Sequence, residues 1–416
     1  MTVQRLLLVL VGLGLVLQGC GPKTPRRIKR PMPLPGATAP SSIAGDREVM
    51  EQTEAEATLL AVEDKVRRVV VKAITEQGLM LRGDRGIDAA CRSTTEALIG
   101  AGDLGAVASH LRLELQREQI TDVSYLPFTF QMTLTGSVPG DVLDFIRRET
   151  RDRGVTHIGV GAARMRGQKV LVTAVLLRRL SLLSAFPRQV KEGSRHLLWV
   201  RPGSAMIRNP HALLASPDGQ TEDIQATRTS RGLEVPLFFN KGKGRYVLQV
   251  LAEDTYGVQV TNQMEVWVGQ PAMRVEKPLP EAEWGTSPKT QEAQLFELVN
   301  RYRQRHGLRP LALSSQLAES ARSHSKDMRD GHFFGHRSPR RGELGQRTTE
   351  IRGLQTVAEN IAMSVSITWA HDGLVSSPSH RRNLLNPDMT HLGIGVVTRD
   401  SGPIRVVYVT QHLGKF

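Results

Sequence analysis

The sequence has little cysteine, few aromatic residues and no apolar run of membrane-spanning length. Two cysteines, Cys20 and Cys91, occur among 416 residues, which excludes a disulfide framework. Aromatic residues make up 5% of the chain, which argues against stacking surfaces for single-stranded nucleic acid. The apolar run from Leu6 to Leu17 is shorter than the roughly 20 residues of a spanning helix. A polytopic membrane protein is therefore excluded.

Acidic residues are in the minority, 41 against 55 basic ones, which gives a formal net charge of +14. Such a charge favours acidic partners, namely nucleic acid, anionic lipid headgroups or anionic cell-wall polymers. Hydrophobic residues at 40% and charged residues at 23% are typical of folded domains with some exposed linker, so a fully disordered chain is excluded.

The N-terminus resembles the leader of a bacterial lipoprotein. Arg5 precedes the apolar run, and LQGC at 17–20 resembles a lipobox, whose cysteine is lipidated and becomes the mature N-terminus. We therefore expect a signal peptide over residues 1–19, a lipid on Cys20 and attachment to a membrane of the cell envelope. Gly21 stands where an aspartate retains some lipoproteins at the inner membrane, which favours an outer membrane in a cell that has one. The alternative is an ordinary secretory leader with an incidental cysteine.

Residues 20–47 are predicted to be an extended tether. Six prolines between residues 21 and 45 oppose regular structure, and five basic residues lie beside the predicted anchor. Anionic headgroups would attract these cations by roughly 1 kcal/mol each. A solvated linker without lipid contact explains the composition equally well.

Three folded regions follow the tether. Residues 48–182 begin with helical periodicity and end in strand signatures. Residues 185–270 carry short β-rich runs at roughly ten-residue spacing, which is typical of a small, Ig-like β-sandwich. A proline-containing linker, 271–290, leads to residues 291–416, which are helical first and end in two strands. The sequence therefore predicts a multidomain α+β protein.

The first and last regions resemble each other. MTHLGIGVV at 389–397 is similar to VTHIGVGAA at 155–163, an offset of 234 residues, and IRVVYV at 404–409 lies opposite VLVTAV at 170–175 at the same offset. Internal repeats of this kind indicate repeated structural units. We interpret residues 48–182 as a divergent copy of the C-terminal domain. The alternative is that two α/β domains converged on a glycine-bounded strand.

Histidines concentrate in the last region, which holds eight of the twelve. Imidazole titrates near neutral pH and ligates metals, so this concentration suggests a site. The region also contains, in order, LVNRYRQRHGLRPL, AESARSHSKDMRDGHFFGHRSP, VAENIAMS and SSPSHRRNLLNPDMTHLGIGV. These segments resemble the bacterial branch of the CAP superfamily, the cysteine-rich secretory, antigen-five and pathogenesis-related proteins. The resemblance implies an α-β-α sandwich with a central cleft over residues 291–416.

The resemblance also implies which residues line the cleft. His336 in GHRSP matches the first histidine of the family, Glu359 in AEN its acid, and His380 in SPSHR the histidine of the bacterial motif. Asn360 would orient its loop rather than react. Two imidazoles and a carboxylate are the minimum for a divalent metal such as zinc, with His336 and His380 as metal ligands. Without a metal, Glu359 would serve as a general base.

Two positions depart from the family pattern and put metal binding in question. Ser377 falls where many members have a further acid, and Ser379 replaces the usual glycine. Other histidines have structural explanations. His306 and His324 fall on helix faces expected at the surface, and His391 is expected to make a structural hydrogen bond at the head of a strand.

Two functions from different classes remain. In the first, the cleft binds an envelope ligand, which is a wall polymer, a lipid or a protein, and catalyses nothing. In the second, His336, Glu359 and His380 serve a metal-assisted hydrolase of envelope polymer or peptide. The incomplete set of acids favours binding, because function depends on the site rather than on the fold. Export argues against nucleic acid as a partner.

The anchor can be tested by one substitution. Cys20→Ser removes the thiol that takes the lipid, so we expect an unprocessed precursor or loss of the protein from the lipid-modified fraction. Metabolic labelling with a fatty acid measures the outcome. Continued labelling of the variant would contradict the lipobox interpretation.

Overall fold

The fold is given by a computed structural model that describes residues 7–8, 12–15, 46–102, 107–150, 153–203, 207–272, 287–364, 366–401 and 404–416. Cys20 and most of the predicted signal peptide, tether and linker lie outside these residues. Within the described ranges, no helix is both long enough and apolar enough to cross a membrane.

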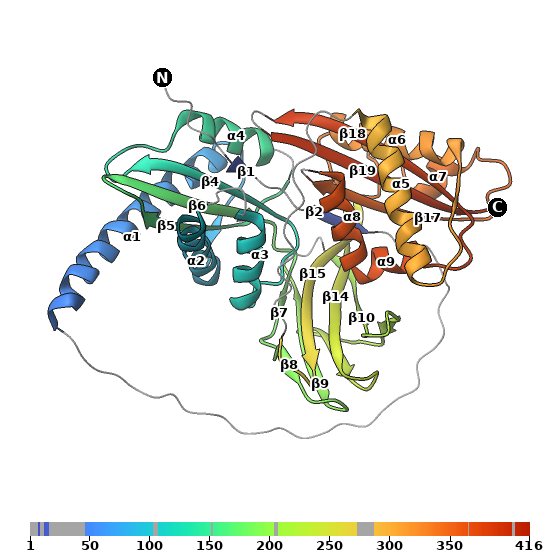
Figure 1. Cartoon of the computed structure of the whole chain (residues 1–416), viewed down its shortest axis with the longest axis horizontal. Helices are drawn as coiled ribbons and strands as arrows, with labels where there is room; N and C mark the ends of the chain where they lie inside the picture. The colour runs from blue at the N-terminus through green and yellow to red at the C-terminus, as the bar shows by residue number, and fades with distance from the viewer. Residues whose placement is uncertain are drawn as a thin grey trace.

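Three structural units follow one another along the chain (Figure 1). The first and third units each contain a mixed sheet with helices, and a β-sandwich lies between them in sequence. Figure 1 shows the two sheet-and-helix units side by side, with the sandwich extending below their junction. The arrangement agrees with the mixed α and β composition predicted from the sequence.

The third unit places one sheet between two layers of helices, as the sequence predicts for this region. Leu392, Ile394 and Val396 of β18 pack with residues of α5 and α8, whereas Gly393 and Gly395 face α6. This alternation is the two-residue period of a strand. The strand order is β16-β18-β19-β17, with β2 at the edge. The elements are α5 (Pro288–Arg305), β16 (Ala312–Leu313), α6 (Ser315–Asp330), α7 (Leu344–Thr348), β17 (Thr356–Ser364), α8 (Ile367–Ser376), α9 (Pro378–Leu384), β18 (His391–Ser401), β19 (Ile404–Lys415) and β2 (Gly12–Leu15).

The first unit has the same plan. Its sheet has the order β4-β6-β5-β3, with β1 at the edge. Apolar residues of α1 and α4 pack on one face, and those of α2 and α3 pack on the other. The elements are β1 (Leu7–Leu8), α1 (Asp46–Thr75), β3 (Arg82–Gly83), α2 (Arg85–Ala101), α3 (Val107–Arg117), β4 (Tyr125–Thr133), α4 (Gly140–Thr150), β5 (His157–Arg164) and β6 (Lys169–Leu177).

The strand registers of the two units agree with the predicted offset for one strand and differ from it for the next. The strands that begin with His157 and His391 correspond at the predicted offset of 234 residues. His157 pairs with Leu177 on the last strand of its unit, whereas His391 pairs with Gly414. The hairpin of the third unit is therefore three residues longer, and the last strands correspond at an offset of 237 residues (414 minus 177).

Glycines at corresponding positions let a helix approach the sheet in both units. A Cβ atom on Gly161 would lie 2.1 Å from the backbone nitrogen of Arg92 in α2. A Cβ atom on Gly395 would lie 2.1 Å from the backbone nitrogen of Arg322 in α6. Since any side chain would collide with helix backbone, the G-x-G pattern in these two strands is a packing requirement.

An ion pair joins the helices at corresponding positions of the two units. Arg92 Nε lies 2.8 Å from Oε1 of Glu63, and Arg322 Nε lies 2.9 Å from Oε1 of Glu292. In both units the same carboxylate oxygen accepts a 3.0 Å hydrogen bond from a backbone N–H of β5 or β18. On this edge, β5 and β18 each pair with a strand of only two residues, β3 or β16. The carboxylate accepts a hydrogen bond from a backbone N–H beyond that short pairing, so it satisfies a donor of the longer strand.

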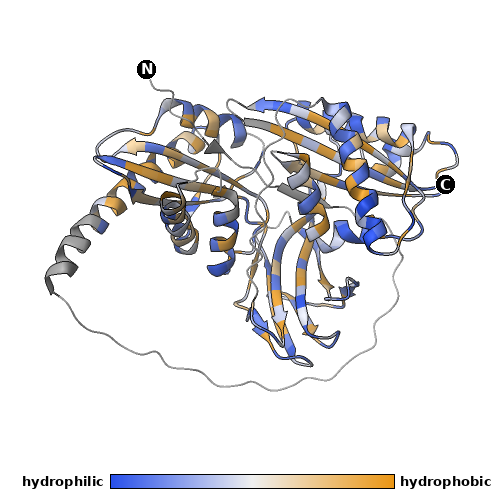
Figure 2. Cartoon of the chain, viewed as in Figure 1, coloured by the Kyte–Doolittle hydropathy of each residue, from blue (hydrophilic) through white to orange (hydrophobic). Residues whose placement is uncertain are grey.

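The second unit consists of two packed sheets with the orders β11-β10-β14-β15-β8 and β12-β13-β9-β7. Residues of both sheets, such as Leu198, Val235, Leu214 and Val250, share one apolar core. Figure 2 shows hydrophobic and hydrophilic residues alternating along its long strands. The strands are β7 (Ser181–Leu183), β8 (Gln189–Val190), β9 (Arg195–Pro202), β10 (Arg208–Ala215), β11 (Thr221–Ile224), β12 (Thr227–Thr229), β13 (Gly232–Phe238), β14 (Gly244–Asp254) and β15 (Gly257–Val268).

The close helix–sheet approach can be tested with three alanine variants. Gly395→Ala and Gly161→Ala should each lower the free energy of unfolding by about 1–3 kcal/mol, because the added methyl group overpacks the contact. Gly100→Ala in α2 is the control, since its Cβ atom would meet nothing within 4 Å and alanine favours helix. Urea denaturation measures all three. Equal stability of Gly395→Ala and Gly100→Ala would contradict the close approach.

Candidate functional site

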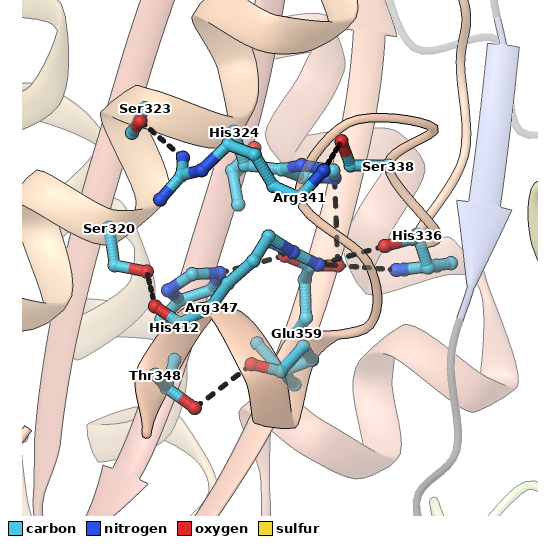
Figure 3. Close-up of polar contacts among 12 residues, drawn as sticks. Ser320, Ser323, His324, His336, Ser338, Arg341, Arg347, Thr348, Glu359 and His412 are labelled. Carbon is cyan, nitrogen blue, oxygen red and sulfur yellow. Dashed lines mark hydrogen bonds and ion pairs between the residues drawn. The ribbon is translucent and has the colours of Figure 1, made fainter. Parts of the chain in front are cut away.

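Glu359 lies at the centre of a fully buried polar cluster (Figure 3). It projects from β17, directly opposite His412 on β19. Its Oε1 is 2.8 Å from Nδ1 of His336, and its Oε2 is 2.7 Å from Nε2 of His412. Because an ionised carboxylate accepts hydrogen bonds and cannot donate them, both of these ring nitrogens carry the proton.

Arg347 supplies the positive charge of the cluster. Its Nη1 donates to Oε2 of Glu359 at 2.8 Å, and its Nη2 donates to Oε1 at 2.9 Å, which is a bidentate pair. The same Nη2 donates to the backbone carbonyl of His336 at 2.8 Å. The guanidinium group therefore fixes both the carboxylate and the loop that presents the imidazole.

Burial and charge set the protonation states within the cluster. Burial alone would raise the pKa of Glu359, but the Arg347 charge and the hydrogen bonds from His336 and His412 hold that pKa well below its usual range. Burial lowers the pKa of His412, and it lowers the pKa of His324 to about 3. At neutral pH the carboxylate is ionised, whereas His324 and His412 are neutral.

His380 has a different partner for its ring. Its Nδ1 lies 2.7 Å from Oγ of Ser377, and its ring is fully buried at the start of α9. The link to the acid runs through the backbone, because Nδ2 of Asn360 donates to the carbonyl oxygen of His380 at 3.3 Å. The structure thus brings His336 to the Glu359 carboxylate and connects His380 to the neighbouring residue of β17.

The two serines that depart from the family pattern bind the β-sandwich. Nε2 of Gln249 on β14 donates to Oγ of Ser377 at 2.7 Å. Oε1 of Gln249 accepts from the backbone N–H of Ser379 at 3.2 Å and also from its hydroxyl group. All three side chains are fully buried. Ser377 and Ser379 therefore form a contact between the second and third units.

The turn between β14 and β15 lies on the loop that carries His336. The carbonyl oxygen of Tyr256 accepts a 2.8 Å hydrogen bond from the backbone N–H of Arg337. A Cβ atom on Gly335 would lie 2.7 Å from that carbonyl oxygen. Together with Gln249, this turn covers the predicted cleft, and the three predicted cleft residues are each 0% exposed.

The donors around Glu359 do not fit a divalent metal. Both carboxylate oxygens already bind an imidazole and a guanidinium nitrogen, so a metal ion would lie against a positive charge. Within the described ranges, no group of three or more His, Cys, Asp or Glu side chains is placed to hold a metal ion. Nδ1 of His336 faces Glu359, whereas Nδ1 of His380 faces Ser377, so these two ring atoms have different partners.

Three further histidines differ in their surroundings. His306 is exposed, as expected from its helix face. His391 makes the expected structural hydrogen bond, with Nδ1 2.8 Å from Oγ1 of Thr390. The surface position expected for His324 is wrong: it is fully buried, with Nε2 3.8 Å from Oε1 of Glu359. Helical periodicity misplaced it because the loop after α6 covers a face that is otherwise polar.

Arg347 and His412 are members of the cluster that the sequence did not identify. His412 could have been found from antiparallel pairing of the strands that contain AEN and QHL, which places it opposite Glu359. Arg347 carries no such signal, because it lies on a five-residue helix in a segment with several exposed arginines. Only its burial distinguishes it from them.

Comparison with known proteins assigns this region. Residues 296–413 match the model of the CAP family, described as the cysteine-rich secretory protein family. The chain is 36% identical over 137 residues to the uncharacterized protein YkwD of Bacillus subtilis, which covers 31% of this chain and 49% of that protein. It is 38% identical over 122 residues to the uncharacterized membrane protein YlbC of the same organism, which covers 29% and 35%. The chain thus spans half or less of the length of these relatives.

The solved structures to which the chain is similar include those of two bacterial proteins. One is an extracellular protein with an SCP domain from Bacillus anthracis, at 22% identity and a TM-score of 0.29, covering 53% of this chain and 81% of that one. The other is a cysteine-rich secretory protein from Staphylococcus aureus, at 17% identity and a TM-score of 0.25, covering 53% and 77%.

The buried ion pair can be tested by removing one partner and then both. Arg347→Met leaves the Glu359 charge buried without its counter-ion, so we expect the free energy of unfolding to fall by about 3–5 kcal/mol. Arg347→Met combined with Glu359→Gln removes both charges and should be less destabilising than the sum of the single changes. Urea denaturation measures each variant.

The control for this series is Arg341→Met. Arg341 is exposed and bonds to Ser323, so its loss should change stability by less than about 0.5 kcal/mol. Strict additivity of Arg347→Met and Glu359→Gln would show that the two side chains do not depend on each other.

Proposed function

Because residues 296–413 form a CAP domain, we propose that this protein is a lipid-anchored protein of the bacterial cell envelope that binds an envelope ligand and catalyses no reaction on it. The ligand is a wall polymer, a lipid or another protein. The lipobox-like segment supports the anchor, and one relative, YlbC, is itself named a membrane protein. The net charge of +14 favours anionic ligands, such as cell-wall polymers and lipid headgroups.

The observation that carries the non-catalytic assignment is the bidentate bond between Arg347 and Glu359. A general base works best when its pKa lies near the working pH, whereas the pKa of Glu359 is held well below its usual range. A hydrolytic metal centre needs a carboxylate and imidazoles with free lone pairs and an open position. The bonds to Arg347, His336 and His412 occupy the carboxylate, which disfavours the metal-assisted hydrolase.

The pair of Ser377 and His380 does not supply an alternative nucleophile. The hydroxyl and Nδ1 are 2.7 Å apart, a distance at which histidine can activate serine. The same hydroxyl accepts a hydrogen bond from Gln249, and its side chain is fully buried. A nucleophile in this position has no path to a polymer substrate.

We further propose that the first unit is a divergent CAP-like copy that has lost the polar cluster. The shared strand order, the glycine contacts and the two ion pairs support common descent over convergence. Strand register places Pro127 at the position of Glu359 and Val175 at that of His412. Thr94 falls at the position of His324, because each is the tenth residue of its helix, α2 or α6. An apolar pair thus replaces the carboxylate and the imidazole.

The test compares binding with turnover on the same material. The purified protein is sedimented with isolated cell-wall sacculi and, separately, with phosphatidylglycerol vesicles, with and without zinc. We expect saturable sedimentation with at least one material and no release of soluble wall fragments in either condition. Histidine NMR signals of His336 and His380 should be unchanged by zinc.

Two outcomes would overturn the proposal. Sedimentation with neither material would contradict binding of a wall polymer or of a lipid. Release of wall fragments that zinc stimulates and that His336→Ala abolishes, with His306→Ala unaffected, would establish the hydrolase instead.

A further inference from the structure

A pocket lies where the three structural units meet, away from the cluster at Glu359. The first unit contributes part of α4 and the segment after β6. The second contributes the β14–β15 turn and the start of β15, and the third contributes the loop after α6 and the hairpin of β18 and β19. In Figure 1 this junction lies at the centre of the molecule, between the two sheets and above the sandwich. No single unit forms the pocket by itself.

A buried carboxylate gathers three arginines on one side of the pocket. Glu149 on α4 has a fully buried side chain. Its Oε2 is 2.6 Å from Nη2 of Arg399 and 3.2 Å from Nη2 of Arg153, and its Oε1 is 3.6 Å from Nε of Arg148. Arg399 belongs to the third unit, whereas the other arginines belong to the first, so this carboxylate binds the two units together.

The pocket carries an excess of positive charge. A fourth arginine, Arg178, lines it and pairs with Asp254 at 2.9 Å. Four guanidinium groups therefore meet two carboxylates, Glu149 and Asp254, which leaves two positive charges uncompensated within this group. Guanidinium groups bind phosphate and carboxylate oxygens with paired hydrogen bonds, so such an excess favours an oxyanion.

Two buried hydrogen-bond donors at the pocket have no partner within the described part of the chain. They are Nε2 of Gln259, whose residue is 5% exposed, and Nε of Arg399. Both residues line the pocket. A buried donor without a partner is unfavourable, so an acceptor that reaches either nitrogen recovers free energy on binding. Both unsatisfied atoms are donors, which again points to a ligand rich in acceptor oxygens.

Aromatic side chains form a further part of the pocket wall. Tyr256 stacks on Phe333 with ring centroids 5.6 Å apart, and Phe334 and Tyr408 also line the space. This wall suits the non-ionic body of a ligand whose charged end faces the arginines. It also excludes part of the solvent, which strengthens each charge–charge contact.

We propose that this pocket binds a phosphate monoester. At neutral pH such a group carries about −1.5 to −2 charges, which matches the excess of two positive charges, and it offers three acceptor oxygens. The same chemistry occurs on small soluble metabolites and on lipid headgroups. By contacting all three units at once, the ligand would fix their relative arrangement. This site is separate from the proposed envelope-binding function and does not depend on it.

The experiment uses the whole purified protein and two probes that carry the same group. Glycerol 3-phosphate is titrated by calorimetry, and vesicles with phosphatidic acid are compared with vesicles of phosphatidylcholine alone by sedimentation. We expect saturable binding of at least one phosphate monoester at one site per chain. Binding of glycerol 3-phosphate indicates a soluble ligand, and binding of phosphatidic acid vesicles alone indicates a lipid headgroup.

Matched arginine variants separate the pocket from general charge. Arg153→Gln and Arg399→Gln should each weaken binding by at least about tenfold, the loss expected for one hydrogen bond to a charged group. Arg341→Gln removes one exposed arginine outside the pocket and should leave the affinity unchanged.

A third variant keeps the test valid if removal of an arginine unfolds the junction. Gln259→Glu preserves size and adds a negative charge among the arginines, so it should retain the fold, checked by circular dichroism, and abolish phosphate binding. Absence of saturable binding to both probes would overturn the proposal. Equal weakening by Arg341→Gln and by the pocket variants would also overturn it, because binding would then reflect diffuse charge.

Discussion

The third unit depends on one buried carboxylate. Glu359 is completely removed from water, and an ionised group in that position is tolerated when its charge is balanced and its oxygens are hydrogen-bonded. Three chain segments supply these partners to the carboxylate on β17: the loop of His336, helix α7 with Arg347 and strand β19 with His412. The cluster therefore holds the loop of His336 against the sheet through hydrogen bonds. Hydrogen bonds are directional, so they define the position of this loop more closely than an apolar contact would.

The second constraint is the closure of this region by the sandwich. A buried glutamine has to satisfy both ends of its amide, and Gln249 does so with Ser377 and Ser379. An acid at 377 would instead place a carboxylate in this buried contact, where it would need a cation. The two departures from the family pattern and the adjacent sandwich therefore have one explanation. Ser377 and Ser379 are the residues through which this domain contacts Gln249 of its neighbour.

Much of the fold could be predicted from the sequence, because hydrophobic periodicity and glycine spacing are local signals. The HxGxG strands, the turn-punctuated sandwich and the pairing of His336 with Glu359 belong to that group, the last through family motifs. The polar cluster could be predicted in part only. Gln249 binds Ser377, which lies 128 residues further along the chain, and Arg347 binds the loop that carries His336. Burial of a long polar side chain leaves no periodic pattern in the sequence, so neither contact could be predicted. For the same reason helical periodicity predicts a surface position for His324, although the loop that contains Gly335 covers it.

The two sheet-and-helix units show two physical solutions to one packing problem. In the third unit, the polar cluster and short helix α7 cover the face beside α6 and β17. In the first unit, helix α3 covers the corresponding face beside α2, with Leu111 and Leu115 in an apolar core, and Pro127 lies opposite Val175 where the third unit has its acid and imidazole. Replacing a buried ion pair by apolar groups is often neutral or stabilising. The architecture thus does not require the cluster, since the first unit keeps its helix layers and its Glu63–Arg92 pair without it. What the cluster adds in the third unit is a loop that hydrogen bonds hold at the surface facing the sandwich, where the backbone N–H of Arg337 donates to the carbonyl oxygen of Tyr256.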